Sequence, residues 1–178
     1  MRVLVCFTTL LTALVLISCN NEPTLQKYFV ENSEKNNFVV LDISPSILNV
    51  DKAKLSAEQK AALASFDKMN ILAFKLDEKN KETYEAESQK VAQIMKGKDY
   101  QQLMKVGSGK DAASISFVGD EDNINEFVVF AKRKENGFAV VRILGDDMNP
   151  NNIMTMLSVL REANIDTAQL APLKDLIK

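Results

Sequence analysis

The stretch EFVVFAKRKENGFAVVRIL, residues 126–144, decides the fold of this chain. Two apolar runs, 126–134 and 138–144, flank the residues Glu135, Asn136 and Gly137. An Asn-Gly pair between apolar runs is a strong hairpin signal, because both residues tolerate the positive φ that a tight turn requires. The sequence therefore predicts an antiparallel β-hairpin as the central unit of the domain.

Both faces of this predicted hairpin are apolar. Phe127, Val129 and Ala131 point to one face, while Val128 and Phe130 point to the other, because successive residues of a strand alternate. Either both faces are covered within the domain or one face meets a partner. We expect internal cover, since the sequence predicts several helices.

The pattern outside the hairpin predicts further strands and helices. Apolar runs predict strands over 38–43, 69–76 and 113–117, and helical spacing predicts helices over 24–35, 57–66, 79–96 and from Pro150 onward. Three sites carry the residues that cap helix starts, namely Thr24, the pair Ser56 and Gln59, and Asn149.

Two shorter segments have weaker signals. Asp99 is expected to cap a short helical turn that presents Leu103 and Met104, and the tail from Asn164 is weakly amphipathic and is expected to add a short helix. The stretch 107–110, Gly-Ser-Gly-Lys, lacks the first glycine and the final hydroxyl of a phosphate loop, so it is interpreted as a plain loop.

These elements predict an α+β fold. We expect a two-layer sandwich, in which a sheet of about five strands ends in an antiparallel meander and the helices pack mainly on one face. The strand order does not follow from the sequence. Residues 24–178 are enough for one hydrophobic core, so a single domain is expected there.

The first residues predict export and lipid anchoring. Arg2 precedes an apolar stretch, residues 3–17, which is shorter than the ~20 residues that a membrane-spanning helix needs. Leu16-Ile17-Ser18-Cys19 resembles the lipobox of bacterial lipoprotein precursors, so we expect cleavage between Ser18 and Cys19 and lipid attachment to Cys19. Residues 19–23 then form a short tether to an envelope membrane.

Composition limits the chemistry of the domain. The chain has no histidine and two cysteines, of which Cys6 leaves with residues 1–18 and Cys19 would carry the lipid. This argues against Cys/His nucleophiles, the usual zinc sites and any disulfide. A net charge of −2 does not suggest nucleic acid as a partner. We therefore expect no cofactor, no metal and no catalytic residues.

Spaced apolar blocks carry a resemblance to a known family. The stretches 69–76, 100–106, 125–130 and 139–146 resemble Bacteroidetes lipoproteins catalogued only as domain of unknown function 4252. The resemblance implies an envelope lipoprotein without assigned active-site residues. We expect it at the outer membrane, facing the periplasm, with the cell surface as the other location.

The expected function is binding rather than catalysis. We predict a non-enzymatic interaction module with an envelope protein as partner and with an interaction surface at Phe130, Lys132 and Arg133 of the hairpin. Two alternatives remain open at this point. One is a small hydrolase that works through a pair of carboxylates, and the other is a carrier of lipid or another small ligand.

Overall fold

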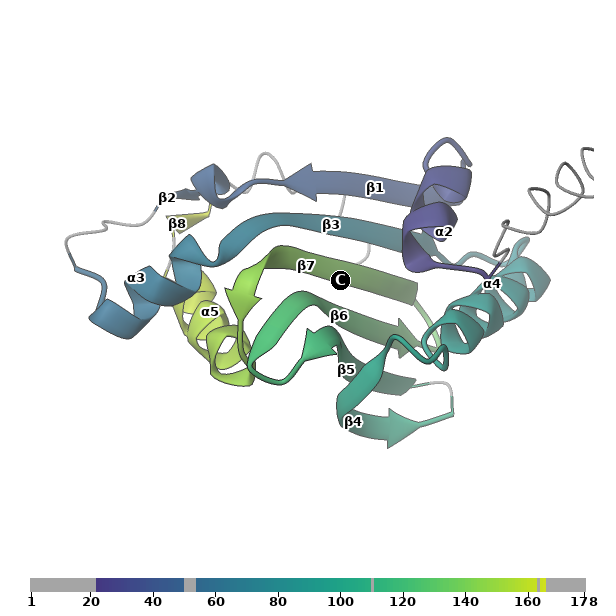
Figure 1. Cartoon of the computed structure of the whole chain (residues 1–178). Coiled ribbons are helices and arrows are strands. Elements are labelled where there is room, and N and C mark those ends of the chain that lie inside the picture. Colours follow the sequence, from purple (N-terminus) through teal and green to yellow (C-terminus); the bar gives the residue numbers. More distant parts are fainter. Residues whose placement is uncertain (1–21, 50–53, 110, 163, 166–178) are drawn as a thin grey trace, which may run out of the picture.

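The computed structural model describes residues 22–49, 54–109, 111–162 and 164–165, and Figure 1 shows how they are arranged. In chain order the elements are α2 (Leu25–Asn32), β1 (Phe38–Ile43), the 3-10 turn η2 (Pro45–Ile47), β2 (Leu48–Asn49), α3 (Ala57–Ala64), β3 (Phe66–Lys75), α4 (Lys81–Ile94), β4 (Gln101–Ser108), β5 (Asp111–Asp120), β6 (Asn123–Arg133), β7 (Gly137–Met148), α5 (Pro150–Glu162) and β8 (Asn164–Ile165).

Six strands form one antiparallel sheet in the order β1-β3-β7-β6-β5-β4, and β2 pairs separately with β8. The predicted hairpin is confirmed, because β6 and β7 pair from Arg133 and Gly137 at the turn to Ile124 and Met148 at the far end. β5 extends the hairpin into the predicted meander. The fold is therefore α+β as predicted, but the sheet has six strands rather than about five.

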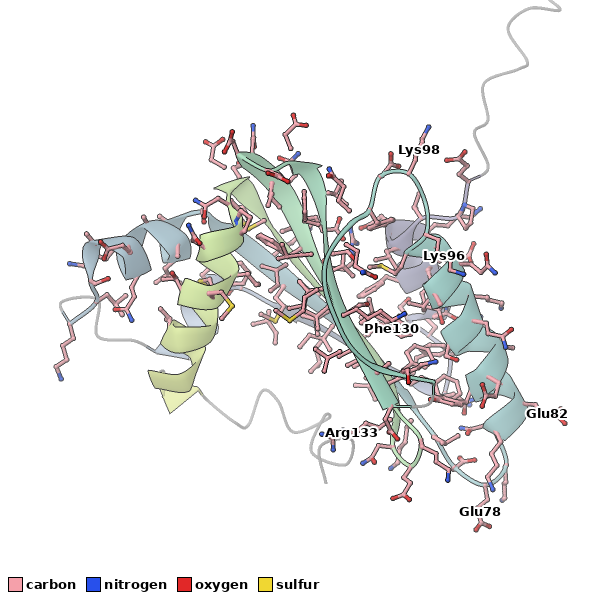
Figure 2. The ribbon with its side chains drawn as sticks, turned by 90° about the horizontal axis from the view of Figure 1, so that it is seen from below. Glu78, Glu82, Lys96, Lys98, Phe130 and Arg133 are labelled. Carbon is pink, nitrogen blue, oxygen red and sulfur yellow. The ribbon has the colours of Figure 1, made fainter. Side chains whose placement is uncertain are left out.

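The helices lie on both faces of the sheet, whereas we expected them mainly on one. α2 and α4 pack against the face to which Val128 and Val140 point. α3 and α5 pack against the opposite face, to which Phe127 and Ile143 point. Figure 2 shows one pair of helices on each side of the strands. Both faces of the central hairpin are apolar because each face meets a different pair of helices.

Aromatic rings dominate the core beneath α2 and α4. Phe74 is fully buried and stacks on Phe138 with a centroid distance of 5.4 Å. Phe38 meets Phe74 edge-on at 5.1 Å, and Tyr84 of α4 lies 6.1 Å from the Phe138 ring. Such ring pairs stabilise a core beyond the area that they bury. They hold three strands and α4 together at one end of the sheet.

A second core lies beneath α3 and α5 on the other face. It combines Ala62 of α3 with two apolar residues of α5 and with side chains of β3, β5, β6 and β7. Its buried members are Ala62, Phe66, Phe117, Ile124, Phe127, Ile143, Met148, Ile153 and Met156. The two cores thus stabilise opposite ends of the same strands.

The predicted helix starts are confirmed. The Ser56 hydroxyl accepts a hydrogen bond from the Gln59 backbone at 3.1 Å, and the Gln59 side chain accepts one from the Ser56 backbone at 2.9 Å. Thr24 accepts from the backbone of Lys27, and Asn149 accepts from a backbone N–H in the first turn of α5. These caps satisfy amide groups that a helix start otherwise leaves unpaired.

One helix end and one strand start differ from the prediction. α3 ends at Ala64, and Phe66 begins β3 instead of closing the helix. The reason is tertiary, because Phe66 pairs with Gly145 of β7 and the Asp146 amide donates to the Ser65 carbonyl at 3.1 Å. A strand partner from the far end of the chain decides where this helix stops.

The segment after α4 differs most. We expected a helical turn presenting Leu103 and Met104, but residues 101–108 form the strand β4. All of its residues are exposed, so it lacks the alternation that reveals a strand with one buried face. Gly107 and Gly109, in the stretch interpreted as a loop, have positive φ where β4 turns towards β5. Apart from Asn164 and Ile165, which form β8, the predicted tail helix lies outside the described residues.

Candidate functional site

Strand β4 forms an exposed edge of the sheet. Among the strands that the structure describes it pairs with β5 alone, and all eight of its residues are exposed. Leu103, Met104 and Val106 are 41%, 47% and 61% exposed, although large apolar side chains usually lie inside a fold. An edge strand also presents unpaired backbone N–H and C=O groups on its outer side. The edge therefore combines apolar side chains with unused hydrogen-bonding groups.

Two features limit what can pair with this edge. The register between β4 and β5 shifts between Gln102 and Met104, so the strand is irregular at Leu103. Lys105 places a positive charge within the regular part, residues 104–108. Bulges and lysines discourage indiscriminate edge pairing. The part of β4 that remains regular is therefore short, residues 104–108.

A groove of about 640 Å³ lies beside β4, at the ends of the β4–β5 and β6–β7 hairpins. It is lined by Lys132 and Arg133, two of the predicted interaction residues, and by Val106 of the edge strand. Asp111 also lines it and accepts a hydrogen bond from the Lys134 backbone at 3.1 Å. The groove thus joins the predicted basic hairpin end to the exposed edge, a connection that required the six-strand order.

The third predicted interaction residue lies elsewhere. Phe130 is only 8% exposed, and its ring packs edge-on against Phe138 at 6.0 Å. Figure 2 shows Phe130 between the sheet and α4, while Arg133 lies at the end of the hairpin. The sequence could have revealed this difference. Side chains alternate between the two faces of a strand, so Phe130 and Arg133, three residues apart, point to opposite faces of the sheet. Phe130 belongs to the core, and the exposed surface consists of the hairpin end and β4.

A buried ion pair ties α2 to the sheet. Arg142 is 5% exposed, and its Nε and Nη2 atoms donate to the two carboxylate oxygens of Glu126 at 2.7 and 3.0 Å. Nη1 donates to the Gln26 side chain of α2, and the guanidinium lies 5.5 Å from the Phe29 ring centroid. Every contact satisfies a buried polar group or anchors a helix. The arrangement is structural rather than catalytic.

Glu87 forms a second polar cluster, between α2 and α4. Tyr28 donates to its Oε2 at 2.8 Å, and Lys90 donates to its Oε1 at 2.7 Å. Burial alone would raise the pKa of the Glu87 carboxyl, but the hydrogen bonds from Lys90 and Tyr28 outweigh burial and lower it. Burial and the hydrogen bond to Glu87 raise the pKa of Tyr28. The carboxyl is therefore held ionised, which suits an ion pair and not a general acid.

Other classes of site can be tested only within the described ranges. No group of three or more His, Cys, Asp or Glu side chains able to hold a metal lies there. Over the same residues, no helix is both long and apolar enough to cross a membrane. Ser18 and Cys19, the predicted cleavage and lipid-attachment residues, lie outside the described residues.

Comparisons with known proteins give one match. A family model described as a domain of unknown function, DUF4252, matches residues 28–156. The matched range runs from α2 into α5 and contains the whole six-stranded sheet. No curated protein and no solved structure matches the chain.

Proposed function

Since the chain belongs to the DUF4252 family, whose description assigns no function, we propose a function from the geometry of its exposed edge. The protein is a lipid-anchored envelope lipoprotein that acts as a non-enzymatic binding module. It captures an extended, acidic segment of an envelope protein, which adds to the sheet beside β4. The observation that carries this proposal is that all eight residues of β4 are exposed, three large apolar side chains among them.

Strand addition explains how so small a surface holds a partner. An extended segment beside β4 would use the unpaired backbone groups for affinity and side-chain contacts for specificity. Met104 and Val106 share a face of the sheet, since they pair with Ile115 and Ala113. Met104 and Val106 therefore continue the apolar surface formed by Ile115 and Ala113 to the edge of the sheet. A partner segment with apolar residues at alternate positions would bury both side chains.

Charge determines which segment fits. Lys105 lies on β4, and the adjacent groove is lined by three basic residues, Lys132, Arg133 and Lys134, and by two acids, Asp111 and Glu135. This excess of positive charge favours an acidic partner segment, because complementary charge speeds encounter and disfavours wrong partners. Arg133 and Lys132 would then serve as the predicted contact residues, without Phe130.

The anchor would restrict where this capture happens. Only residues 19–23 separate the predicted lipid on Cys19 from the cap of α2, and five extended residues span roughly 18 Å. The domain would therefore stay close to its membrane and bind segments exposed near that surface.

The hydrolase alternative receives no support from the described carboxyl groups. Hydrolysis by two carboxylates needs one of them to be held protonated by a raised pKa. Glu87 has a lowered pKa, and the pKa of Glu58 is also lowered, by the hydrogen bond from Ser56. Both shifts run opposite to the one that the alternative requires.

The test compares two exposed valines. A photo-cross-linking residue is placed at Val106, 61% exposed on β4, or at Val30, 66% exposed on α2, in cells that carry the full chain. We expect a defined partner to cross-link from position 106 and not from position 30. The purified partner should then slow hydrogen exchange of the β4 amides. Val106→Asp should weaken the complex about tenfold or more, and Val30→Asp should leave it unchanged.

Three results would contradict the proposal. Equal cross-linking from both positions would indicate unspecific contact. Protection of amides outside β4 would place the contact on another surface. Cross-linking of position 106 to a second copy of this chain would show that the edge serves self-association instead of partner capture.

A further inference from the structure

A second concave site lies on the face of the sheet that carries α4. It is a hollow of about 220 Å³ between the end of α4 and strands β4, β5 and β6. Ala112, Ser114 and Ser116 of β5 face it, and these small side chains leave space beside Phe130. We call this site the β5 hollow. Figure 2 shows the two sides of the site, with Lys96 just beyond α4 and Phe130 reaching from the sheet towards that helix.

Three lysines surround the β5 hollow. Lys96 follows α4, Lys105 lies on β4, and Lys132 lies on β6. None of their side chains makes an ion pair or a hydrogen bond with a described residue. No Asp or Glu is among the described residues that line the hollow, although the chain as a whole has a net charge of −2. Positive charge therefore collects here without a counter-ion from the part of the chain that the structure describes.

The hydroxyl of a largely buried serine opens into the same space. Ser116 is only 3% exposed and lines the β5 hollow, yet its side chain makes no hydrogen bond with any residue that the structure describes. Fully enclosed side-chain polar atoms in the described part of the chain all have partners, so the Ser116 oxygen must reach the hollow. Because this hydroxyl has no partner among the described side chains, it can donate a hydrogen bond to a ligand group in the hollow.

We propose that the β5 hollow binds a phosphate group. Lysine ammonium groups bind phosphate as mobile point charges, and the Ser116 hydroxyl can donate to one of its oxygens. The carbonyl end of α4 carries partial negative charge, which acts against an anion, and Lys96 at that end offsets it. This site does not depend on strand addition, because an added strand would use the outer edge of β4, whereas the hollow lies on the face of the sheet beside α4.

The start of the domain lies near this hollow. The Leu25 amide at the first turn of α2 donates to the Tyr100 hydroxyl at 3.4 Å, and Tyr100 directly precedes β4. If Cys19 carries a lipid, the hollow lies at the membrane-proximal end of the domain. A phosphate group could then come from a lipid headgroup or from a free phosphate compound, and the experiment separates these two sources.

The test measures binding to the full chain, extracted from its own membrane in dodecyl maltoside, which contains no phosphate. Inorganic phosphate and dihexanoylphosphatidylglycerol are titrated separately by isothermal titration calorimetry. We expect saturable binding of one ligand per chain for at least one probe, with an affinity that falls as salt rises. Ser116→Ala and Lys105→Gln should each weaken binding about tenfold. Lys60→Gln makes the same charge change on α3 and should have no effect.

Each outcome decides the question. Binding of the lipid alone assigns the hollow to a headgroup, and binding of inorganic phosphate assigns it to a free phosphate. No binding of either probe, or equal weakening by Lys60→Gln, would overturn the proposal. Ser116→Ala should leave the thermal unfolding temperature unchanged, which separates lost binding from lost folding. Because Ser116→Ala spares β4 and Val106→Asp spares the lining of the hollow, the two proposals can fail independently.

Discussion

At the scale of single residues, buried polar side chains hold the helices on the sheet. Glu87 contacts Tyr28 of α2 and Lys90 of its own helix, and Arg142 joins β7 to Gln26 of α2. A buried charge is costly unless it is paired, so each of these groups depends on its partner. Helix α2 is therefore joined to the rest of the molecule by two polar clusters as well as by its apolar side chains.

The Glu87 cluster predicts how stability depends on pH. Because the folded state lowers the pKa of Glu87, this group stabilises the fold above its unfolded pKa, near 4.3, and the contribution is lost as the pH falls through the folded value. We expect the free energy of unfolding to fall below about pH 4. Glu87→Gln should cost about 1–2 kcal/mol at pH 7 and should reduce this acid dependence.

Urea denaturation at several pH values measures both effects. Glu85→Gln is the matched control, because Glu85 is an exposed neighbour on the same helix. If the two variants had the same stability at every pH, the hydrogen bonds from Tyr28 and Lys90 would contribute nothing to folding.

At the scale of elements, the β6–β7 turn depends on a glycine. Gly137 has a φ of 120°, and a Cβ atom there would lie 1.9 Å from the Phe74 carbonyl oxygen of β3. Gly109, at the β4–β5 turn, has a φ of 66° but open space around it. A substitution at Gly109 therefore tests backbone strain alone, whereas one at Gly137 tests backbone strain together with a steric clash.

Alanine substitutions at these glycines should differ in cost. Gly109→Ala should destabilise by about 1–2 kcal/mol, because only the left-handed backbone opposes it. Gly137→Ala should cost more than about 3 kcal/mol, since β3 must also move away from β7. Chemical denaturation of both variants checks this order. Equal costs would mean that the sheet adjusts freely beside the turn.

At the scale of the whole molecule, the predicted anchor would determine where the two proposed surfaces work. The β4 edge and the β5 hollow both include β4, the edge strand of the six-stranded sheet, and both would be tethered by residues 19–23. Two acyl chains or more hold a protein stably at a membrane, whereas one holds it only marginally. The anchor would turn weak binding sites into local ones of high effective concentration.

The two cysteines allow a matched test of the anchor. Cys19→Ser should abolish incorporation of labelled palmitate and leave the uncleaved precursor mass, because the thiol that receives the lipid is gone. Cys6→Ser, within the predicted export signal, should change neither property. Intact mass measurement and lipid labelling report both. Wild-type protein with a free Cys19 thiol would remove the basis for the lipoprotein assignment.

The local features of this chain follow from its sequence alone. The Asn136-Gly137 turn, the capping box at Ser56 and the apolar periods of α2 and α4 depend on neighbours a few residues away, so the pattern predicts them. Family membership also follows from the sequence, because the spacing of its apolar blocks can be recognised without the structure. The basic hairpin end at Lys132 and Arg133 was visible for the same reason.

Only the tertiary structure decided the rest, because it depends on contacts between distant segments. Phe66 joined a strand since β7 provides a partner, and β4 stayed undetected since an exposed strand needs no apolar alternation. The β5 hollow lies between α4 and three strands. Ser116 becomes a candidate binding residue only because the fold brings lysines of other elements around it. The sequence determines the secondary structure of segments with a strong local preference for helix, strand or turn. Packing against distant segments determines the secondary structure of those without such a preference.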